Sequence, residues 1–439
     1  MSAHSLAVWM NGERVGLWST PPGRPQSFRY DDAWLESAAR RVLSLSLPFT
    51  VGNQPLRGAP VAHFFENLLP DNDQIRRRLQ TRFHSDSGSA FDLLAAIGRD
   101  CVGAIQLLPE DHEAPDVKKI QARRLDADGV AQAIRATLSS GSTLAGHDAD
   151  DFRFSIAGAQ EKTALLYHRG NWCIPCGATP TTHIFKLPLG LIGGMAADMR
   201  DSVENEWLCH QILKAYGLPV AECEMARFAE QRVLIVKRFD RAPASGWIAR
   251  LPQEDFCQAL GCSPSNKYEA EGGPSMGDIL RVLAGSSRPE EDRRNFLRAQ
   301  LVFWILAATD GHAKNFSLFH ERGGGYRLTP FYDVLSAWPI IGNGPNFLAW
   351  PKAKLAMAVR SKNAHWKLAD IKRRHWEHIG RTGGLGGDGK WIEQIAHTTP
   401  AVIEHVRGLL PPGFPGAVAD AIFTGMTRQS AQLAANRAI

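Results

Sequence analysis

The stretch Asp310-Gly-His-Ala-Lys-Asn315, followed further on by Phe331-Tyr332-Asp333, places two carboxylates and an amide close together in the chain. A positioned carboxylate can accept the proton of an attacking hydroxyl. Carboxylate and amide oxygens are also the ligands that Mg²⁺, a hard cation, prefers. The stretch therefore predicts a magnesium-dependent phosphotransferase in which Asp310 is the base and Asn315 and Asp333 hold the metal.

Protein kinases carry the same three polar groups, as H-R-D-x-x-x-x-N followed by D-F-G. An Asp and an Asn at this spacing also arise by chance, and both are common turn residues. The second carboxylate favours the functional interpretation. Tyr326 to Thr329 is predicted to be a short strand ended by Pro330, so Asp333 follows a strand, as kinase metal ligands do. Pro289 to Thr309 is predicted to be a buried helix that carries Asp310 at its end.

A kinase also needs a lysine on a strand, where the ammonium contacts the α- and β-phosphates of ATP. The candidate is Lys186 in His183-Ile-Phe-Lys-Leu187. A lysine inside a short apolar strand is costly unless something pairs with it. Glu204 or Glu206, in the helical pattern that starts at Asp201, is expected to be that partner. The alternative is an edge-strand lysine whose ammonium reaches water.

The predicted phosphate loop precedes this lysine, as Ser155-Ile-Ala-Gly-Ala-Gln-Glu-Lys162, and a strand from Thr163 to Tyr167 follows it. Small residues at Ala157, Gly158 and Ala159 allow backbone N–H groups to approach phosphates closely. The loop matches neither G-x-G-x-x-G nor G-x-x-x-x-G-K-[ST]. Without further context it is only a turn of small residues.

Together these motifs resemble the HipA family, the serine/threonine kinase toxins of bacterial toxin–antitoxin pairs. The resemblance covers residues 5 to 357. Its other motifs are Leu43 to Pro48, Phe64 to Asp71, Ile97 to Asp100, Thr179 to His183, Arg238 to Arg241 and Leu251 to Asp255. It implies an α+β fold, namely a two-lobed protein-kinase-like core with a β-rich N-lobe and a helical C-lobe, preceded by a small β-rich N-terminal subdomain.

The expected domains are an N-terminal subdomain at 1–110, a kinase N-lobe with the phosphate loop and ATP lysine at 111–240, and a helical C-lobe with the catalytic loop and metal site at 241–439. A chain of 439 residues exceeds what one hydrophobic core comfortably fills. The N-terminal subdomain is predicted to open with a hairpin, because Asn11-Gly12 lies between the apolar runs Ser5–Met10 and Glu13–Trp18.

The resemblance also implies ATP and Mg²⁺ as cofactors and assigns roles to individual residues. The family's autophosphorylation site matches Ser155, and its phosphorylation expels the phosphate loop and inactivates the kinase. The adenine hinge matches Lys237, Arg238 and Phe239, mainly through their backbone. The residues expected to contact the nucleotide are Ala157, Gly158, Ala159, Gln160, Glu161, Lys162, Lys186, Lys237, Arg238, Phe239, His312, Lys314, Asn315, Tyr332 and Asp333.

Position 312 is His where protein kinases usually have Lys, so Lys314 is hypothesised to neutralise the transferred phosphate. Family members phosphorylate translation machinery, notably glutamyl-tRNA synthetase. They are neutralised by a small helix-turn-helix antitoxin, HipB, and form an operator-binding complex with it. Two alternatives are a small-molecule kinase, which the N-terminal motifs disfavour, and a catalytically inactive co-repressor, which the complete catalytic set disfavours.

The composition is typical of a globular protein, with 44% hydrophobic residues, 12 Trp and 20 Phe. The absence of a signal-peptide-like N-terminus and of a long apolar stretch predicts a soluble cytoplasmic protein. Seven Cys without regular spacing fit a reducing compartment. Cys173-Ile-Pro-Cys176 has no second pair at zinc-binding spacing, so a tight turn between two strands is expected there.

Positive charge is concentrated in one segment. Residues 351–382 carry nine Lys and Arg against Asp370 and Glu377, a net +7, whereas the whole chain is +5. Such a run is often only a solvated helix face, but it also suits contact with a phosphate backbone. We hypothesise that this segment, through Lys372, Arg373 and Arg374, supports operator binding in the complex with the antitoxin.

Overall fold

The computed structural model describes residues 4–138, 155 and 160–435, which divide into two compact units. The first unit holds the two larger sheets, and the second holds most of the long helices. The first unit comprises Met1–Leu187, Ala226–Asn266 and Ser317–Tyr326, and the second comprises Pro188–Met225, Lys267–Phe316 and Arg327–Ile439. Antiparallel sheets and segregated helices give the α+β class that the sequence predicts.

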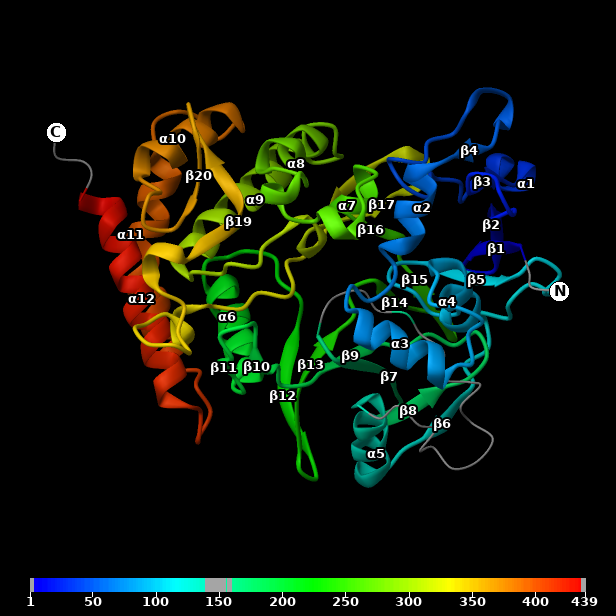
Figure 1. Ribbon diagram of the computed structural model, residues 1–439, viewed down its shortest axis with the longest axis horizontal. Coiled ribbons are helices and arrows are strands. Elements are labelled where there is room, and N and C mark those ends of the chain that lie inside the picture. The colour runs from blue at the N-terminus through cyan, green and yellow to red at the C-terminus, as the bar shows by residue number, and fades with distance from the viewer. Residues whose placement is uncertain (1–3, 139–154, 156–159, 436–439) are drawn as a thin grey trace. The chain divides into compact units, whose positions relative to one another are not determined.

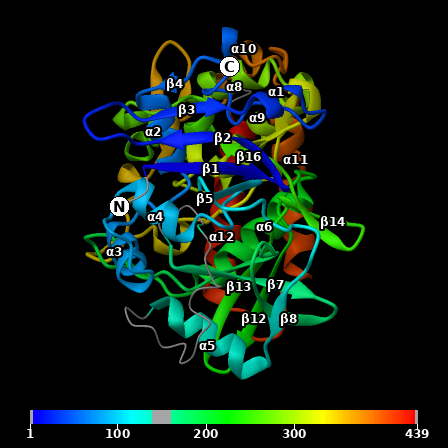
Figure 2. The same cartoon turned by 90° about the vertical axis from the view of Figure 1, so that its right-hand side faces the viewer.

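The first sheet of the first unit has the strand order β4-β3-β2-β1-β5, and Figure 2 shows β1, β2 and β3 side by side. The strands are β1 (Ser5–Met10), β2 (Glu13–Ser19), β3 (Ser27–Tyr30), β4 (Leu56–Arg57) and β5 (Ile105–Pro109). The predicted hairpin is confirmed, since β1 pairs antiparallel with β2 and Met10 lies opposite Glu13. Asn11 and Gly12 both have positive φ, 50° and 88°, which a type I′ turn requires.

Helices close the inner face of this sheet around aromatic side chains. They are α1 (Asp32–Glu36), α2 (Ala59–Glu66), α3 (Asp73–Arg82) and α4 (Ala90–Ile97). The rings of Trp18 from β2 and Phe65 from α2 stack with centroids 3.9 Å apart, and Phe91 from α4 meets Trp18 edge-on. Full burial of such side chains stabilises the folded state by roughly 1.5–3 kcal/mol each, so this subdomain has a hydrophobic core of its own.

The second sheet has the order β12-β13-β9-β7-β8-β6. Its strands are β6 (Ala122–Arg124), β7 (Lys162–His168), β8 (Asn171–Pro175), β9 (His183–Lys186), β12 (Cys223–Phe228) and β13 (Gln231–Lys237), and α5 (Ala127–Leu138) covers one face. The turn expected at Cys173 to Cys176 is wrong. Cys173 lies within β8, because the chain reverses earlier, at Arg169 and Gly170, which both have positive φ.

Short elements complete the first unit. The hairpin β14 (Arg241–Ala244) and β15 (Trp247–Arg250) follows β13, and β16 (Gln253–Asp255) pairs with β17 (Ser317–His320). Asp255 then caps the short helix α7 (Phe256–Ala259) through a capping box with Gln258.

The second unit is mainly helical, and α11 and α12 pack side by side in it (Figure 1). Its helices are α6 (Ser202–Ala215), α8 (Met276–Leu283), α9 (Pro289–Ile305), α10 (Arg373–Thr382), α11 (Lys390–Arg407) and α12 (Gly416–Ala435). Its hairpins are β10 (Gly190–Ile192) with β11 (Ala197–Met199), and β19 (Lys354–Arg360) with β20 (Ala364–Lys367). The second half of α9 is buried almost all round, as its apolar sequence predicts.

The predicted helix 289–309 is correct at its start and wrong at its end. Helix α9 ends at Ile305, because Ala307 adopts a left-handed conformation with φ 49°. The N–H groups of Ala307 and Ala308 turn back to the carbonyls of Trp304 and Phe303, which closes the helix. Asp310 therefore stands on a loop past the helix. Strand β18 (Tyr326–Leu328) is where the sequence predicts it.

Within the ranges described, no helix is long and apolar enough to cross a membrane.

Candidate active site

The loop that follows α9 presents Asp310, whose side chain is 64% exposed. The loop is tightly formed, since the N–H of His312 donates to the carbonyl of Asp310 at 2.8 Å. A Cβ on Gly311 would lie 2.7 Å from the ring of Phe303 on α9. Only glycine fits that contact without displacing a buried aromatic ring, so the Asp-Gly pair is fixed by packing as well as by turn preference.

The amide of Asn315 lies beside Asp333, and its Nδ2 donates to the backbone carbonyl of Asp333 at 3.4 Å. Asn315 is 4% exposed, and its Oδ1 accepts no hydrogen bond from any residue that the structure describes. A buried acceptor without a donor is costly. Mg²⁺ is bound by amide and carboxylate oxygens together with waters and phosphates. The oxygen atoms of Asn315 and Asp333 are therefore suitable ligands for a magnesium ion.

Asp333 has an unusual backbone conformation, with φ 60° in the left-handed region. Aspartate enters this region more readily than most residues, but the conformation is still uncommon and is held by neighbouring contacts. Tyr332 helps to impose it, because its hydroxyl donates to the carbonyl of Lys314 at 2.9 Å. Hydrogen bonds from Asn315 and Tyr332 thus join the two predicted metal-binding segments.

His312 and Lys314 lie on the inner side of the same loop, 5% and 7% exposed. The short 3₁₀ turn Ala313–Asn315 places them there. The imidazole of His312 stays close to the exposed carboxylate, with its Nε2 3.9 Å from Oδ1 of Asp310.

The predicted ATP lysine lies in the first unit, on β9, where Lys186 is 6% exposed. The register places Lys162 of β7 directly opposite Lys186. The two predicted phosphate contacts therefore lie on one face of the sheet, and their binding of phosphate stays a prediction. Glu204 and Glu206 are both buried in α6 of the second unit, and which of them pairs with Lys186 stays a prediction.

Ser155 is buried in the first unit, with 1% of its surface exposed. Its hydroxyl donates to the carbonyl of Leu68 at 2.7 Å, and its N–H donates to the carbonyl of Asp100 at 3.0 Å. Predicted loop residues Ala157, Gly158 and Ala159 lie outside the described residues. At the far end of the loop, the side-chain amide of Gln160 donates to the carbonyl of Leu187 at 2.5 Å, and Glu161 forms an ion pair with Arg78.

The predicted adenine hinge follows β13, and there Arg238 has a structural role. Its backbone N–H donates to the carbonyl of Thr182 at 2.9 Å. Its guanidinium pairs with Asp100 at 3.3 Å and with Asp240 at 2.8 Å. These bonds occupy the backbone N–H and the guanidinium of Arg238. An adenine contact through the backbone of Lys237, Arg238 and Phe239 stays a prediction.

A buried ionic cluster surrounds Asp100, and no single motif of the sequence predicts it. Its carboxylate pairs with Arg241 at 2.9 Å, Arg250 at 3.1 Å and Arg238, and accepts a hydrogen bond from Thr181 at 2.7 Å. Burial alone would raise the pKa of Asp100, but the three arginines outweigh it and hold the pKa well below its usual range. The sequence signal that could have indicated this cluster is the pair of motifs Ile97–Asp100 and Arg238–Arg241, which lie far apart in the chain.

Of the three DNA-contact candidates, Arg373 is engaged inside the second unit. It is 6% exposed, and its guanidinium pairs with Glu377 at 2.8 Å and with Glu393 of α11 at 2.7 Å. Arg374 is exposed and Lys372 is half-buried at the start of α10. The hypothesis of a DNA contact is therefore best tested on Lys372 and Arg374.

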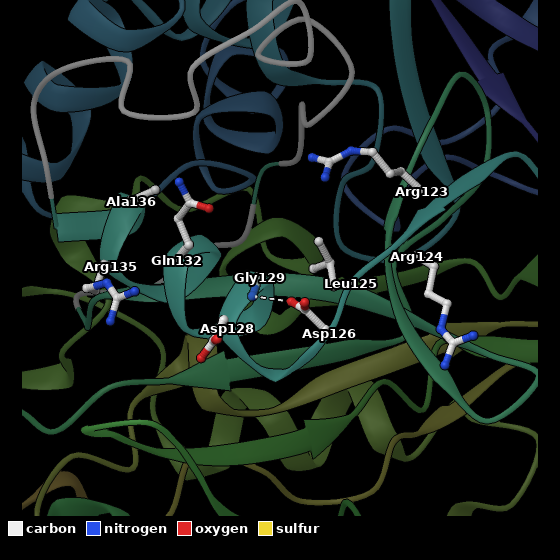
Figure 3. A pocket seen from close by; sticks show the side chains of 9 residues that line it. All are labelled: Arg123, Arg124, Leu125, Asp126, Asp128, Gly129, Gln132, Arg135 and Ala136. Carbon is white, nitrogen blue, oxygen red and sulfur yellow. Dashed lines mark hydrogen bonds between the residues drawn. The ribbon is translucent and has the colours of Figure 1, made fainter.

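A separate hollow of about 800 Å³ lies in the first unit, between β6 and α5 (Figure 3). It is lined by Arg123, Arg124, Leu125, Asp126, Asp128, Gly129, Gln132, Arg135 and Ala136. The two aspartates offset much of the arginine charge, and Arg135 pairs with Glu230 at 2.6 Å. None of the predicted site residues lines this hollow, and we assign it no part in phosphate binding.

Two family models match the chain. The HipA-like C-terminal domain matches residues 154–406, and the HipA N-terminal domain matches residues 6–108. The larger match includes Ser155, Lys186, Asp310, Asn315 and Asp333. Both halves of the chain are thus accounted for by the same family.

Named relatives and a solved structure agree with these matches. The protein named Putative kinase Y4mE, from Sinorhizobium fredii, is 33% identical over 391 residues, 88% of this chain and 87% of that protein. The serine/threonine-protein kinase toxin HipA of Shewanella oneidensis is 29% identical over 290 residues, 63% of each chain. The solved complex of HipA, HipB and operator DNA from Shewanella oneidensis superposes with a TM-score of 0.76 at 25% identity, covering 98% of this chain and 96% of that one. The fold is the two-lobed, kinase-like α+β architecture that the sequence predicts.

Proposed function

Because this chain belongs to the HipA family, we propose that it is an ATP- and magnesium-dependent serine/threonine protein kinase, the toxin of a toxin–antitoxin pair. The observation that carries the proposal is the buried Oδ1 of Asn315 beside Asp333, an acceptor to which none of the described residues donates. A magnesium ion bound there would neutralise charge on the transferred phosphate. Asp310, on the same loop, is the base.

In this proposal each side chain has one task. Lys186 and Lys162, which face each other on β9 and β7, bind the phosphates of the nucleotide. Asn315 and Asp333 hold the metal, and the carboxylate of Asp310 accepts the proton of the serine or threonine hydroxyl. Lys314 is proposed to stabilise negative charge on the transferred group, as the nearest cation in the loop.

We propose that Ser155 is the autophosphorylation site and that its modification inactivates the enzyme. The Ser155 hydroxyl is buried and bonded to Leu68, so the residue must leave this position before it can be phosphorylated. A phosphoserine carries nearly two negative charges, which the buried position cannot accommodate without a cationic partner. Phosphorylation would therefore keep Ser155 out of its buried position.

The test is incubation of the purified chain with Mg-ATP, followed by intact-mass and peptide mass spectrometry. We expect a gain of about 80 Da, one phosphoryl group, on the peptide that contains Ser155. The Ser155→Ala variant should lack this modification and retain activity toward a protein substrate for longer. A chain that never gains the mass in the presence of Mg-ATP would argue against the proposed function.

We propose a component of the translation machinery as the protein substrate, with glutamyl-tRNA synthetase as the first candidate by family resemblance. Incubating a cell lysate with labelled ATP and the chain, with the Asp310→Asn variant as the blank, would identify it. A HipB-type helix-turn-helix antitoxin and operator DNA are the proposed partners, by analogy with the complex of Shewanella oneidensis.

The basic segment gives a separate prediction about operator binding. Replacing Lys372 and Arg374 by Ala should reduce the slope of log K against log salt by about 0.9 for each DNA phosphate that the variant no longer neutralises. The measurement is a salt titration of the antitoxin complex on operator DNA. The matched control is Lys390→Ala, since Lys390 is a surface lysine paired with Asp388. An unchanged slope in the double variant would remove this segment from the DNA interface.

A further inference from the structure

The proposed base lacks the burial that normally holds a catalytic side chain in place, because the carboxylate of Asp310 is 64% exposed. Catalytic groups must be held within about 0.5 Å of the productive geometry, usually by hydrogen bonds from neighbouring residues. An exposed carboxylate on a loop needs such a bond more than a buried one does.

That bond is supplied by Tyr268, whose hydroxyl donates to Oδ1 of Asp310 at 2.6 Å. We propose that Tyr268 is the positioning residue for the base, an inference that rests on the proposed kinase function. Tyr268 holds Oδ1 and leaves Oδ2 to accept the proton of the serine or threonine hydroxyl. The oxygen of that hydroxyl bonds to the γ-phosphorus of ATP as the bond from the γ-phosphorus to ADP breaks, and ADP leaves with the electron pair.

Tyr268 is itself fixed against the catalytic loop by two other contacts. Its ring meets the ring of His312 edge-on, with centroids 4.9 Å apart and planes at 81°. Its neighbour Lys267 accepts a backbone hydrogen bond from Ala313 at 3.4 Å. The segment that carries Tyr268 therefore lies alongside the loop of residues 310–313, and from there the Tyr268 hydroxyl reaches Asp310.

The residue after Tyr268 anchors the segment on its other side. Glu269 is 8% exposed, and its carboxylate accepts from the N–H of Ala358 at 2.6 Å and from Nε of Arg360 at 2.8 Å. Both donors lie on β19. A charge-assisted bond to a buried carboxylate is among the stronger hydrogen bonds in proteins. Strand β19 thus fixes Glu269, and Glu269 fixes the backbone from which Tyr268 holds the base.

A different role for the same hydroxyl is to occupy the place of the substrate hydroxyl, so that each substrate has to displace it. The anchoring at Lys267, His312 and Glu269 favours a permanent support, because a group that leaves during each turnover would not need three supports. The two roles predict opposite effects of removing the hydroxyl.

The test is Tyr268→Phe, which keeps the ring on His312 and removes only the hydroxyl. In the full-length chain, the rate constant of Ser155 phosphorylation at saturating Mg-ATP should fall about tenfold to a hundredfold. The Mg-ATP concentration at half-maximal rate and the thermal midpoint should stay unchanged. In an Asp310→Asn background the same change should have no further effect on the residual rate, because the two groups act as a unit.

The matched control is Tyr216→Phe, which removes another tyrosine hydroxyl, bonded to Thr399 at 2.7 Å in the interior. It should lower the thermal midpoint and leave the phosphorylation rate unchanged. The role of Tyr268 would be overturned by equal rates in wild type and Tyr268→Phe, by a faster rate in Tyr268→Phe, or by additive losses in the double variant. Each of these outcomes would leave the proposed kinase function standing. A wild-type chain that phosphorylates nothing would instead overturn the proposed function, and this role with it.

Discussion

The Asp310→Asn variant is expected to lose phosphoryl transfer by about a hundredfold to ten-thousandfold, the range that a positioned base contributes. Asparagine has the same shape as aspartate and can still accept the hydrogen bond from Tyr268. It cannot take the proton of the substrate hydroxyl. The loss is measured as the rate of label transfer from γ-labelled ATP to Ser155 and to a protein substrate.

The same variant should keep its fold, because the Asp310 side chain is exposed and has no part in the core. Its thermal midpoint and its affinity for Mg-ATP should match those of the wild type. Labelling at the wild-type rate would exclude Asp310 as the base. A large fall in the thermal midpoint of Asp310→Asn would mean that the variant loses activity because it unfolds.

The largest effect on stability is expected from Asp100→Asn. Asp100 compensates three buried arginines, and loss of its charge leaves Arg238, Arg241 and Arg250 with Asp240 as the remaining carboxylate of the cluster. Removing one partner of a buried ion pair costs about 3–5 kcal/mol, because the remaining charge stays buried without compensation. Denaturant unfolding of the two proteins at pH 7 measures this difference.

The control for Asp100→Asn is Asp198→Asn, which removes a close but exposed pair with Arg200, at 2.5 Å. Exposed ion pairs contribute little, so its unfolding midpoint should stay near the wild-type value. If Asp100→Asn were as stable as wild type, the cluster would not contribute to the stability of the fold.

The cluster also makes stability depend on acidity in a defined direction. The pKa of Asp100 is lowered in the folded chain, since its arginine partners outweigh the burial that would raise it. The stabilisation that the Asp100 carboxylate contributes is therefore complete above its pKa in the unfolded chain, near 3.9. It is lost as the pH falls toward the pKa of Asp100 in the folded chain. Below about pH 4 the wild-type chain should lose stability more steeply than Asp100→Asn does.

Local sequence signals predicted the local structure well. The hairpin at Asn11-Gly12 and the strands around Lys186 and Tyr326 follow from turn chemistry and alternation, which act over a few residues. The predicted end of α9 was wrong, because a left-handed Ala307 has no strong signal in the sequence. The turn near Cys173 was wrong, because the chain reverses earlier, at Arg169 and Gly170, where the glycine was the available signal. Alanine and arginine adopt such conformations only where the surrounding packing imposes them.

The sequence by itself identified the family, since the order and spacing of Asp310, Asn315, Asp333 and Lys186 carry the resemblance, and it predicted the chemistry at Asp310 to Asn315. Only the tertiary structure brought Tyr268 to Asp310, placed Lys162 opposite Lys186 and gathered three arginines around Asp100. Those partners are distant in the chain, and no local periodicity relates them. Burial selects them, because a buried or precisely oriented charge must be satisfied by whichever side chain the fold brings within reach.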